Sequence, residues 1–469
     1  MIVLVVCAAA ELRRVTVLMR HGTKVPNAGI VSLCPSYGTL LDAFRSLSTK
    51  PGSLTPSGVA QCHAMGQWAR TRYAGHSGLL PEDYDPQSFA FISQRSGFCV
   101  ESTAAFASGY FEGRAGGRFA KAQGAPIDVP FPEPGTDVLL NCRDGPCKSA
   151  FDGSAKQAEE ALAAEWDEKF GGNLTSLMSA CGTSSRPGME AVKAISDGLV
   201  WALEAGLLGT AALASSPLAS PALHRAVDEM AVWLTRRIFV DPVLSIAACG
   251  WPDRFFSSLE GAAAATADPA PPLLDFYLNH REVLYGALDA LGLTDFAFPD
   301  RGRRGKARRV PTGTAVFFEL HVGLDGAAGV VVRAASPPHE PPTSAAVRAT
   351  AEVGEVSSRE LTPRGCEEGA VCPLQTLRDN YDRFLAKYGS LASRCHLDAP
   401  AVAAAAKDEP SADAATAEPP SAFGRPQMCV WVLAAASAGM LASVAGSRTL
   451  SCRRSGRRAL REGLLNVKC

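Results

Sequence analysis

Short apolar runs alternate with helical patterns along the central part of the chain. Residues 15–19, 89–93 and 273–279 are rich in β-forming residues, and the first and third runs hardly alternate with polar positions. Such runs are typical of strands that are covered on both faces of a sheet. The second and third runs lead into helical patterns, so we expect an α/β fold with a mainly parallel sheet flanked by helices.

Local signals mark where several elements begin and end. Thr55 followed by proline predicts a helix start, and that helix continues to about residue 73. Residues 283–291 carry an apolar face with helical spacing, and Gly292 ends it. The runs 315–322 and 329–333 flank a glycine-containing turn, which predicts a hairpin.

Both ends of the chain carry a second kind of apolar run. Residues 2–10 end in three alanines, which predicts a signal peptide, short at its start, over residues 1–10; the alternative is an N-terminal strand. Residues 428–446 hold no charge, and 19 residues are just enough to span a hydrocarbon layer of about 30 Å. A buried alanine-rich helix is the alternative, but arginines cluster immediately after this run, as the positive-inside rule requires.

These runs divide the chain into a body and an anchor. Residues 396–427 are rich in Ala, Pro, Asp and Glu without apolar periodicity, which is typical of a stalk. We therefore expect a body over residues 11–395, a transmembrane helix over 428–446 and a basic cytosolic tail over 447–469. This organisation predicts a single-pass type I membrane protein of the cell surface, endosome or lysosome, with a lumenal or extracellular body.

Composition and charge narrow the partners of the body. The 469 residues include 46 Lys+Arg and 47 Asp+Glu, so a net charge of −1 gives no overall field to hold nucleic acid, and we expect no nucleic-acid partner. Residues 301–309 are the local exception, with six basic side chains. A solvated insertion is the simplest interpretation, and a patch for an anionic partner or a processing site are the alternatives.

The cysteines fit an oxidising compartment. Ten of the 14 lie in the predicted body, an even number that suits a disulfide framework. Cys142 with Cys147 and Cys366 with Cys372 form two close pairs, but neither belongs to a double CxxC pattern, so we expect no structural zinc. The sequon at residues 173–175 fits a secreted glycoprotein.

Cationic or imidazole side chains follow each of the three predicted strands. Arg20 and His21 follow the first strand, Arg95 the second and His280 the third. Because ligands bind beyond the carboxyl ends of parallel strands, these side chains predict one anion site.

The first of these motifs connects the chain to a known family. Residues 20–26, Arg-His-Gly-Thr-Lys-Val-Pro, resemble the RHGxRxP signature of the histidine acid phosphatases, the second branch of the histidine phosphatase superfamily. The further segments that resemble motifs of this family are residues 54–58, 94–96, 319–321 and 366–374. The resemblance runs from about residue 14 to 388, and it is thin between about 115 and 265, where the family has a helical cap.

The resemblance implies a role for each residue of the site. His21 is implied as the nucleophile that becomes transiently phosphorylated. The residues implied to bind phosphate are Arg20, Lys24, Arg95 and His280. Where the family has His-Asp, this chain has His280-Arg281-Glu282, which resembles the His-Ala-Glu of the related inositol polyphosphate phosphatases. Glu282 is therefore implied as the proton donor, with a plain helix-start carboxylate as the alternative.

The implied activity is that of a membrane-anchored acid phosphatase that hydrolyses phosphomonoesters through a phosphohistidine, with no metal or cofactor. Two departures from the family pattern, Lys24 in place of arginine and Arg281 in place of aspartate, support an alternative. In that alternative the body is a catalytically impaired, phosphatase-like ectodomain that acts as a binding or trafficking module. The predicted partners are a phosphomonoester substrate and, through residues 428–446, the lipid bilayer.

Overall fold

The computed structural model describes residues 10–47, 49–111, 127, 129–208, 210, 216–264, 272–293, 310–338 and 355–397. By its internal contacts the chain divides into a body, residues 1–123 and 128–415, and a second unit, residues 124–127 and 416–469. Ile127 alone represents the second unit among the described residues, so the following description concerns the body.

Several sequence predictions fall outside the described residues. They concern the apolar segment 2–9, the basic run 301–309, most of the stalk, the apolar run 428–446 and the basic tail. Within the described part, no helix is long and apolar enough to cross a membrane.

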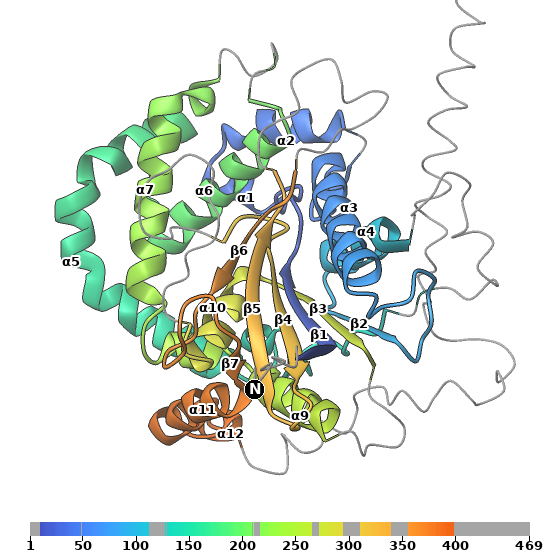
Figure 1. The fold of residues 1–469 in the computed structure, drawn as a ribbon. Helices are drawn as coiled ribbons and strands as arrows, with labels where there is room; N and C mark the ends of the chain where they lie inside the picture. Colours follow the sequence, from blue (N-terminus) through green and yellow to red (C-terminus); the bar gives the residue numbers. More distant parts are fainter. Residues whose placement is uncertain are drawn as a thin grey trace, which may run out of the picture. The chain divides into compact units, whose positions relative to one another are not determined.

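A mixed sheet forms the centre of the body (Figure 1). Its strand order is β2-β3-β1-β4-β5-β6, and β7 also pairs with β5. The strands are β1 Glu11–Arg20, β2 Phe89–Ser93, β3 Leu274–Asn279, β4 Ala315–Val322, β5 Ala328–Ser336, β6 Ser357–Leu361 and β7 Cys372–Pro373.

The expectation of a mainly parallel sheet is wrong for four of these seven strands. β3 pairs in parallel with both β1 and β2, whereas β4, β5, β6 and β7 all pair antiparallel to their neighbours. For β4 and β5 the physical reason is their connection, a short turn that can only join antiparallel strands, and this confirms the predicted hairpin. The three parallel strands are the ones that carry the predicted anion site.

Helices cover both faces of the sheet and also form an insertion. The helices at the sheet are α3 Pro56–Arg70, α4 Gly97–Phe111, α9 Trp251–Ala263, α10 Arg281–Ala290 and α11 Leu374–Tyr388. The inserted helices are α5 Lys148–Cys181, α6 Met189–Glu204, α7 Pro221–Ile238 and α8 Val243–Ala247. Shorter elements are α1 Ile30–Leu33, α2 Tyr37–Arg45, η1 Thr71–His76, η3 Cys142–Asp144, η4 Pro217–Ala219 and α12 Leu391–Arg394.

Alternate residues of the central strands face different helices. Phe276 of β3 meets Phe106 of α4, with 4.3 Å between the ring centres. Phe318 of β4 meets Trp251 of α9 on the other side, at 5.5 Å. Because both faces are buried, β1 and β3 read as nearly continuous apolar runs in the sequence.

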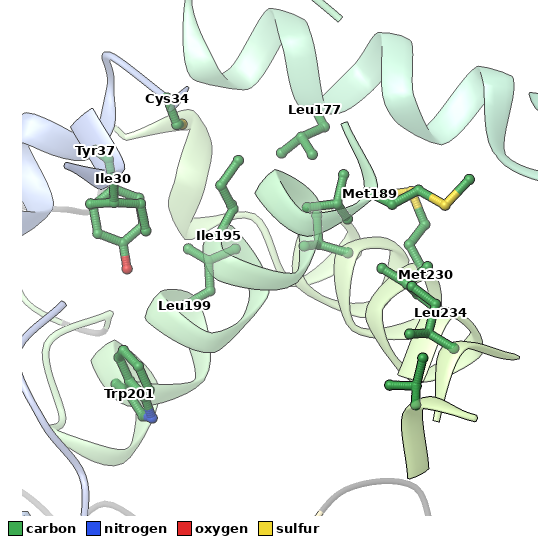
Figure 2. Close-up of a cluster of buried hydrophobic side chains, with 14 of the residues drawn as sticks. Ile30, Cys34, Tyr37, Leu177, Met189, Ile195, Leu199, Trp201, Met230 and Leu234 are labelled. Atoms are coloured by element: carbon green, nitrogen blue, oxygen red, sulfur yellow. The ribbon is translucent and has the colours of Figure 1, made fainter. Parts of the chain in front are cut away.

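The inserted helices have a hydrophobic core of their own (Figure 2). Leu177 of α5, Ile195 of α6 and Met230 of α7 are fully buried in it, together with Tyr37 of α2. This core occupies much of the segment that the sequence predicts as a cap, although α9 in the same segment packs on β1 and β4 instead. The sequon 173–175 lies inside α5.

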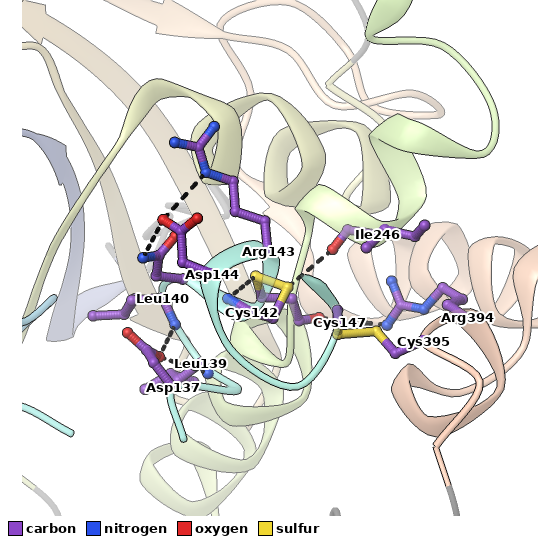
Figure 3. Close-up of a disulfide and its surroundings, with 12 residues drawn as sticks. Asp137, Leu139, Leu140, Cys142, Arg143, Asp144, Cys147, Ile246, Arg394 and Cys395 are labelled. Carbon is purple, nitrogen blue, oxygen red and sulfur yellow. Dashed lines mark hydrogen bonds and ion pairs between the residues drawn. A yellow bond between two sulfur atoms is a disulfide. The ribbon is translucent and has the colours of Figure 1, made fainter. Parts of the chain in front are cut away.

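Disulfides tie the insertion to the rest of the body (Figure 3). They join Cys34 to Cys181, Cys142 to Cys249, Cys147 to Cys395 and Cys366 to Cys372. The local pair Cys366–Cys372 is confirmed, whereas Cys142 and Cys147 do not pair with each other. Cys142, the first residue of η3, bonds to Cys249, and Cys147 bonds to Cys395. Cys62 and Cys99 are free and buried, so eight of the ten body cysteines form disulfides.

Candidate active site

The sheet edge brings His21 and His280 together, as the sequence predicts. The parallel register pairs Arg20 with Asn279, the last residues of β1 and β3, and each histidine follows directly. The backbone N–H of His21 donates to the carbonyl of Asn279 at 3.1 Å, which extends the ladder beyond the strands. The centres of the two imidazole rings lie 5.4 Å apart.

His21 has the orientation and protonation state of a nucleophile. Its Nδ1 lies 2.8 Å from the carbonyl oxygen of Gly22, and because a carbonyl only accepts, Nδ1 carries the proton and Nε2 keeps a free lone pair. Burial lowers the pKa of His21 well below its usual value, and Arg20, His280 and Lys24 lower it further. The ring is therefore neutral in mildly acidic solution.

Close backbone packing fixes the loop that carries His21. A side chain at Gly22 would collide with the carbonyl of Gly58 in α3, because its Cβ would lie 2.5 Å from that oxygen. Thr55 caps this helix by accepting from the N–H of Gly58, which confirms the predicted helix start, and its hydroxyl donates to the carbonyl of Thr23 at 2.9 Å. The N–H of Gly313 donates to the carbonyl of His21 at 2.9 Å.

Two buried cations lie at the nucleophile. Arg20 donates to the carbonyl of Val310, and burial first and Arg281 second lower its pKa to about 10, so it stays charged in acid. The Lys24 ammonium lies 4.1 Å from the ring centre of Phe98 and 4.9 Å from that of Trp201. Burial lowers the pKa of Lys24 to about 8, so it is also a cation in acid.

Arg95 does not join these cations in the structure. Its guanidinium is half exposed and pairs with the exposed Glu133 at 3.2 Å. The same strand-to-helix connection instead places Phe98 beside His21, with 4.8 Å between ring centres. The sequence motif after β2 therefore predicts the correct segment, but the residue of that segment that contacts His21 is Phe98 and not Arg95.

His280 completes the imidazole pair at the start of α10. Burial, followed by the charge of Arg143, lowers the pKa of His280 to about 3. This histidine is therefore neutral over the mildly acidic range and offers hydrogen bonds rather than charge.

Glu282 lies among three cations in the first turn of α10. Its Oε1 is 3.4 Å from Lys193 Nζ, 3.4 Å from Arg281 Nε and 3.6 Å from Arg143 Nη1. Burial alone would raise the pKa of this carboxyl, but Arg143, Lys193 and Arg281 outweigh burial and lower the pKa well below the usual value. Glu282 is therefore ionised.

Arg281 has a separate carboxylate partner. Its two terminal nitrogens donate to both oxygens of Asp197 in α6, at 2.7 and 2.8 Å. This bidentate pair is almost completely buried on the arginine side. The substitution that departs from the family pattern is thus matched by an acidic residue from the insertion.

Helix α6 lines the site, a contribution that the sequence analysis missed. Four residues at helical spacing along one side of α6 contact residues of the site. Lys193 contacts Glu282, and Asp197 contacts Arg281. Trp201 contacts Lys24, and Glu204 contacts Thr23. Three of these four residues are polar positions at helical spacing in a largely apolar helix, a pattern that the sequence shows without indicating which site the helix faces.

A buried polar cluster adjoins the loop of His21. The carboxylate of Glu204 accepts from the hydroxyls of Thr23 and Thr312, the latter at 2.7 Å. Gln61 of α3 accepts from the N–H of Thr23 at 2.9 Å. Within the described residues, no group of three or more His, Cys, Asp or Glu side chains is placed to hold a metal ion.

Comparison with known proteins assigns the family. Residues 11–326 match the histidine phosphatase superfamily (branch 2), so the chain belongs to this superfamily. No curated protein sequence matches the chain.

Solved structures share the fold at low identity. The phytase of Citrobacter braakii is 17% identical with a TM-score of 0.56, covering 80% of this chain and 98% of that one. The Hafnia alvei phytase in complex with tartrate is 16% identical with a TM-score of 0.56, covering 80% and 96% of the two chains. The Klebsiella sp. ASR1 phytase is 14% identical with a TM-score of 0.56, covering 84% and 98%.

Proposed function

We propose that the protein is a phosphatase that hydrolyses phosphomonoesters through a phosphohistidine at His21. The observation that carries this proposal is the bond from Nδ1 to the Gly22 carbonyl, which leaves Nε2 free beside Arg20 and Lys24. Nε2 attacks phosphorus, the ester bond breaks, and water then hydrolyses the nitrogen–phosphorus bond. Membership of the superfamily supports this chemistry.

In the proposed mechanism the other residues stabilise the phosphate and activate water. Arg20 and Lys24 neutralise charge on its oxygens, and neutral His280 donates a hydrogen bond. Glu282 gives a proton to the departing oxygen once the bound phosphate dianion has raised its pKa, and it then takes a proton from the attacking water. Its ionised state in the free site suits the second of these roles. The low pKa of His21 keeps the nucleophile unprotonated in acid, which supports an acid phosphatase.

The test is formation of the phosphoenzyme. We expect the purified full-length chain to hydrolyse 4-nitrophenyl phosphate at mildly acidic pH, and brief exposure to labelled substrate to leave label on His21. His21→Ala should lose both signals and keep the wild-type circular dichroism spectrum, because no second nucleophile replaces the imidazole. Wild-type turnover in this variant would contradict the mechanism.

The second candidate function is a silent binding module. The observation that favours it is Arg281, which occupies the position of a catalytic acid and is itself paired with Asp197. Such a module would bind inorganic phosphate in calorimetry without hydrolysing any ester or forming labelled His21.

We further propose a membrane anchor at residues 428–446, with the body in the lumen or outside the cell. The charge-free run and the arginines that follow it support this proposal. The full-length chain should stay in the membrane fraction through alkaline washing, whereas truncation before Met428 should release it. A full-length chain found entirely in the soluble fraction would rule the anchor out.

A further inference from the structure

The Lys24 ammonium contacts the faces of two aromatic rings. Its Nζ lies 4.1 Å from the ring centre of Phe98, at the start of α4, and 4.9 Å from that of Trp201 in α6. The charge of Asp197 also attracts the ammonium, but the two oxygens of Asp197 accept from Arg281. The contacts that fix this cation therefore come mainly from the two rings.

These contacts explain how a charge is tolerated at this depth. Lys24 is 6% exposed, Phe98 7% and Trp201 8%. Burying an ammonium is costly unless a partner compensates for the water that it loses. The negative face of an aromatic ring attracts a cation, and this attraction strengthens where water is excluded. Two such faces therefore stabilise the charged form of Lys24 inside the site.

The same two rings border the nucleophile. The imidazole centre of His21 lies 4.8 Å from the ring centre of Phe98 and 6.3 Å from that of Trp201. Lys24 is close enough for its charge to act on the His21 imidazole. The rings thus hold the ammonium at the side of His21, where the proposed mechanism places the phosphoryl group.

A ring face leaves more of the cation to a ligand than a carboxylate does. It carries no net charge, so it does not neutralise the ammonium, and the positive charge stays available to a phosphate. An arginine at this position would present a planar fork of donors, whereas a lysine has a flexible four-carbon stem that its surroundings must fix. Phe98 and Trp201 supply these surroundings for Lys24.

Building on the proposed function, we propose that Phe98 and Trp201 are positioning residues that hold the Lys24 ammonium beside His21 for the phosphoryl group. The two rings act through Lys24 and take no part in the bond changes themselves. The inserted helix α6 thereby contributes to phosphate binding through Trp201. In this arrangement a lysine can replace the arginine of the family pattern, because the rings fix the position that the guanidinium fork would otherwise fix.

A double-mutant cycle between Lys24 and Trp201 tests the proposal. The dissociation constant of inorganic phosphate is measured by calorimetry in mildly acidic solution for full-length wild type, Trp201→Leu, Lys24→Met and the double variant. We expect Trp201→Leu to weaken phosphate binding by about tenfold in the wild-type background. In the Lys24→Met background, where no ammonium remains to be held, the loss should be less than about twofold. Equal losses in both backgrounds would overturn the positioning role.

Matched variants separate this role from a contribution to folding. Trp201→Phe keeps an aromatic face and should bind phosphate within about threefold of wild type. Trp233→Leu removes a tryptophan of the insertion whose ring contacts Trp166 and Arg237 instead of Lys24, and it should leave phosphate affinity unchanged. If Trp201→Leu does not fold, Phe98→Leu replaces it in the cycle. Failure of both leucine variants to fold would show that the rings are structural and would overturn the proposal.

The same measurements distinguish this inference from the proposed function. If wild type binds phosphate and His21 is labelled by 4-nitrophenyl phosphate, an unchanged affinity in Trp201→Leu overturns only the role of the rings. If wild type binds no phosphate and His21 stays unlabelled, the proposed function fails and this inference fails with it.

Discussion

Two buried glutamates in this protein are surrounded by similar charges but differ in geometry. Glu319 of β4 is bound by Arg72 of η1 at 2.6 and 3.0 Å and by the Tyr73 hydroxyl at 2.8 Å. The cations around Glu282 are all 3.4 Å away or more. Both carboxylates are ionised, since each has a lowered pKa despite its burial.

The difference separates a structural carboxylate from a reactive one. Around Glu319, short hydrogen bonds from Arg72 and Tyr73 of η1 reach both oxygens, and Arg333 of β5 adds a longer contact at 3.4 Å. Around Glu282, the cations come from η3, α6 and α10 and hold the charge without closing the carboxylate in short bonds. A glutamate surrounded by cations thus stabilises the fold at Glu319, whereas at Glu282 it keeps an oxygen available for chemistry.

The largest effect is expected from Glu282→Gln. If Glu282 deprotonates the attacking water, this variant should lower kcat by about 10²–10⁴-fold and accumulate phosphorylated His21, because the second step slows. Rapid-quench measurements with 4-nitrophenyl phosphate should show a burst followed by a slow steady state. The matched control is Glu319→Gln, which should keep its kcat per folded molecule. If Glu282→Gln keeps wild-type kcat, Glu282 is only a helix-start carboxylate.

The next effect concerns stability and belongs to Glu319. Burial would raise the pKa of this carboxyl, but the neighbouring His321 and the hydrogen bonds from Arg72 and Tyr73 lower the pKa to about 2. A shift from 4.5 to about 2 corresponds to about 3 kcal/mol of the free energy of unfolding. This contribution to stability is complete above about pH 4.5 and is lost as the pH falls toward 2. The reason is that the unfolded chain takes up the proton near pH 4.5, whereas the folded protein takes it up only near pH 2.

Urea unfolding of wild type and Glu319→Gln measures the contribution of the Glu319 carboxylate to the free energy of unfolding. At pH 6 the variant should be less stable by about 3 kcal/mol, and the gap should narrow steadily as the pH falls from about 4.5 toward 2. Glu282→Gln serves as the comparison and should lose less, because its cations make no short bonds to it. A gap that is independent of pH would show that the ion pairs of Glu319 do not cause it.

Lys24 is a third buried charge, but it packs on aromatic rings instead of pairing with a carboxylate. Because burial lowers its pKa to about 8, the ammonium is charged below that pH and becomes neutral above it. The affinity for inorganic phosphate, measured as a competitive inhibition constant, should therefore fall as the pH rises through about 8, by up to about tenfold per pH unit. Lys24→Arg should abolish this step, since a guanidinium keeps its proton. If phosphate affinity still falls near pH 8 in Lys24→Arg, the titrating group is not Lys24.

The features that the sequence predicts are those encoded locally. The strand ends, the cap at Thr55 and the meeting of His21 with His280 follow from short patterns and from the geometry of parallel strands. The lining by α6 could not be predicted in this way, because Asp197 meets Arg281 across 84 residues of sequence. The hairpin of β4 and β5 is predicted locally and confirmed, but its antiparallel pairing with β1 could not be predicted, because a hairpin in the sequence does not reveal which strand it joins.

Arg95 is the site residue whose placement differs most from the expectation, and it should give the smallest effect. Its pair with Glu133 is exposed on both sides, and such pairs contribute about 0–1 kcal/mol, so the guanidinium could exchange this partner for a substrate phosphate at little cost. The side chain that lies against His21, however, is Phe98, and the cations beside His21 are Arg20 and Lys24. We therefore expect Arg95→Ala to change kcat/KM for 4-nitrophenyl phosphate by less than about threefold, and Glu133→Ala to do the same. A tenfold rise in KM for Arg95→Ala alone would show that Arg95 swings onto the bound phosphate, as the sequence motif predicts.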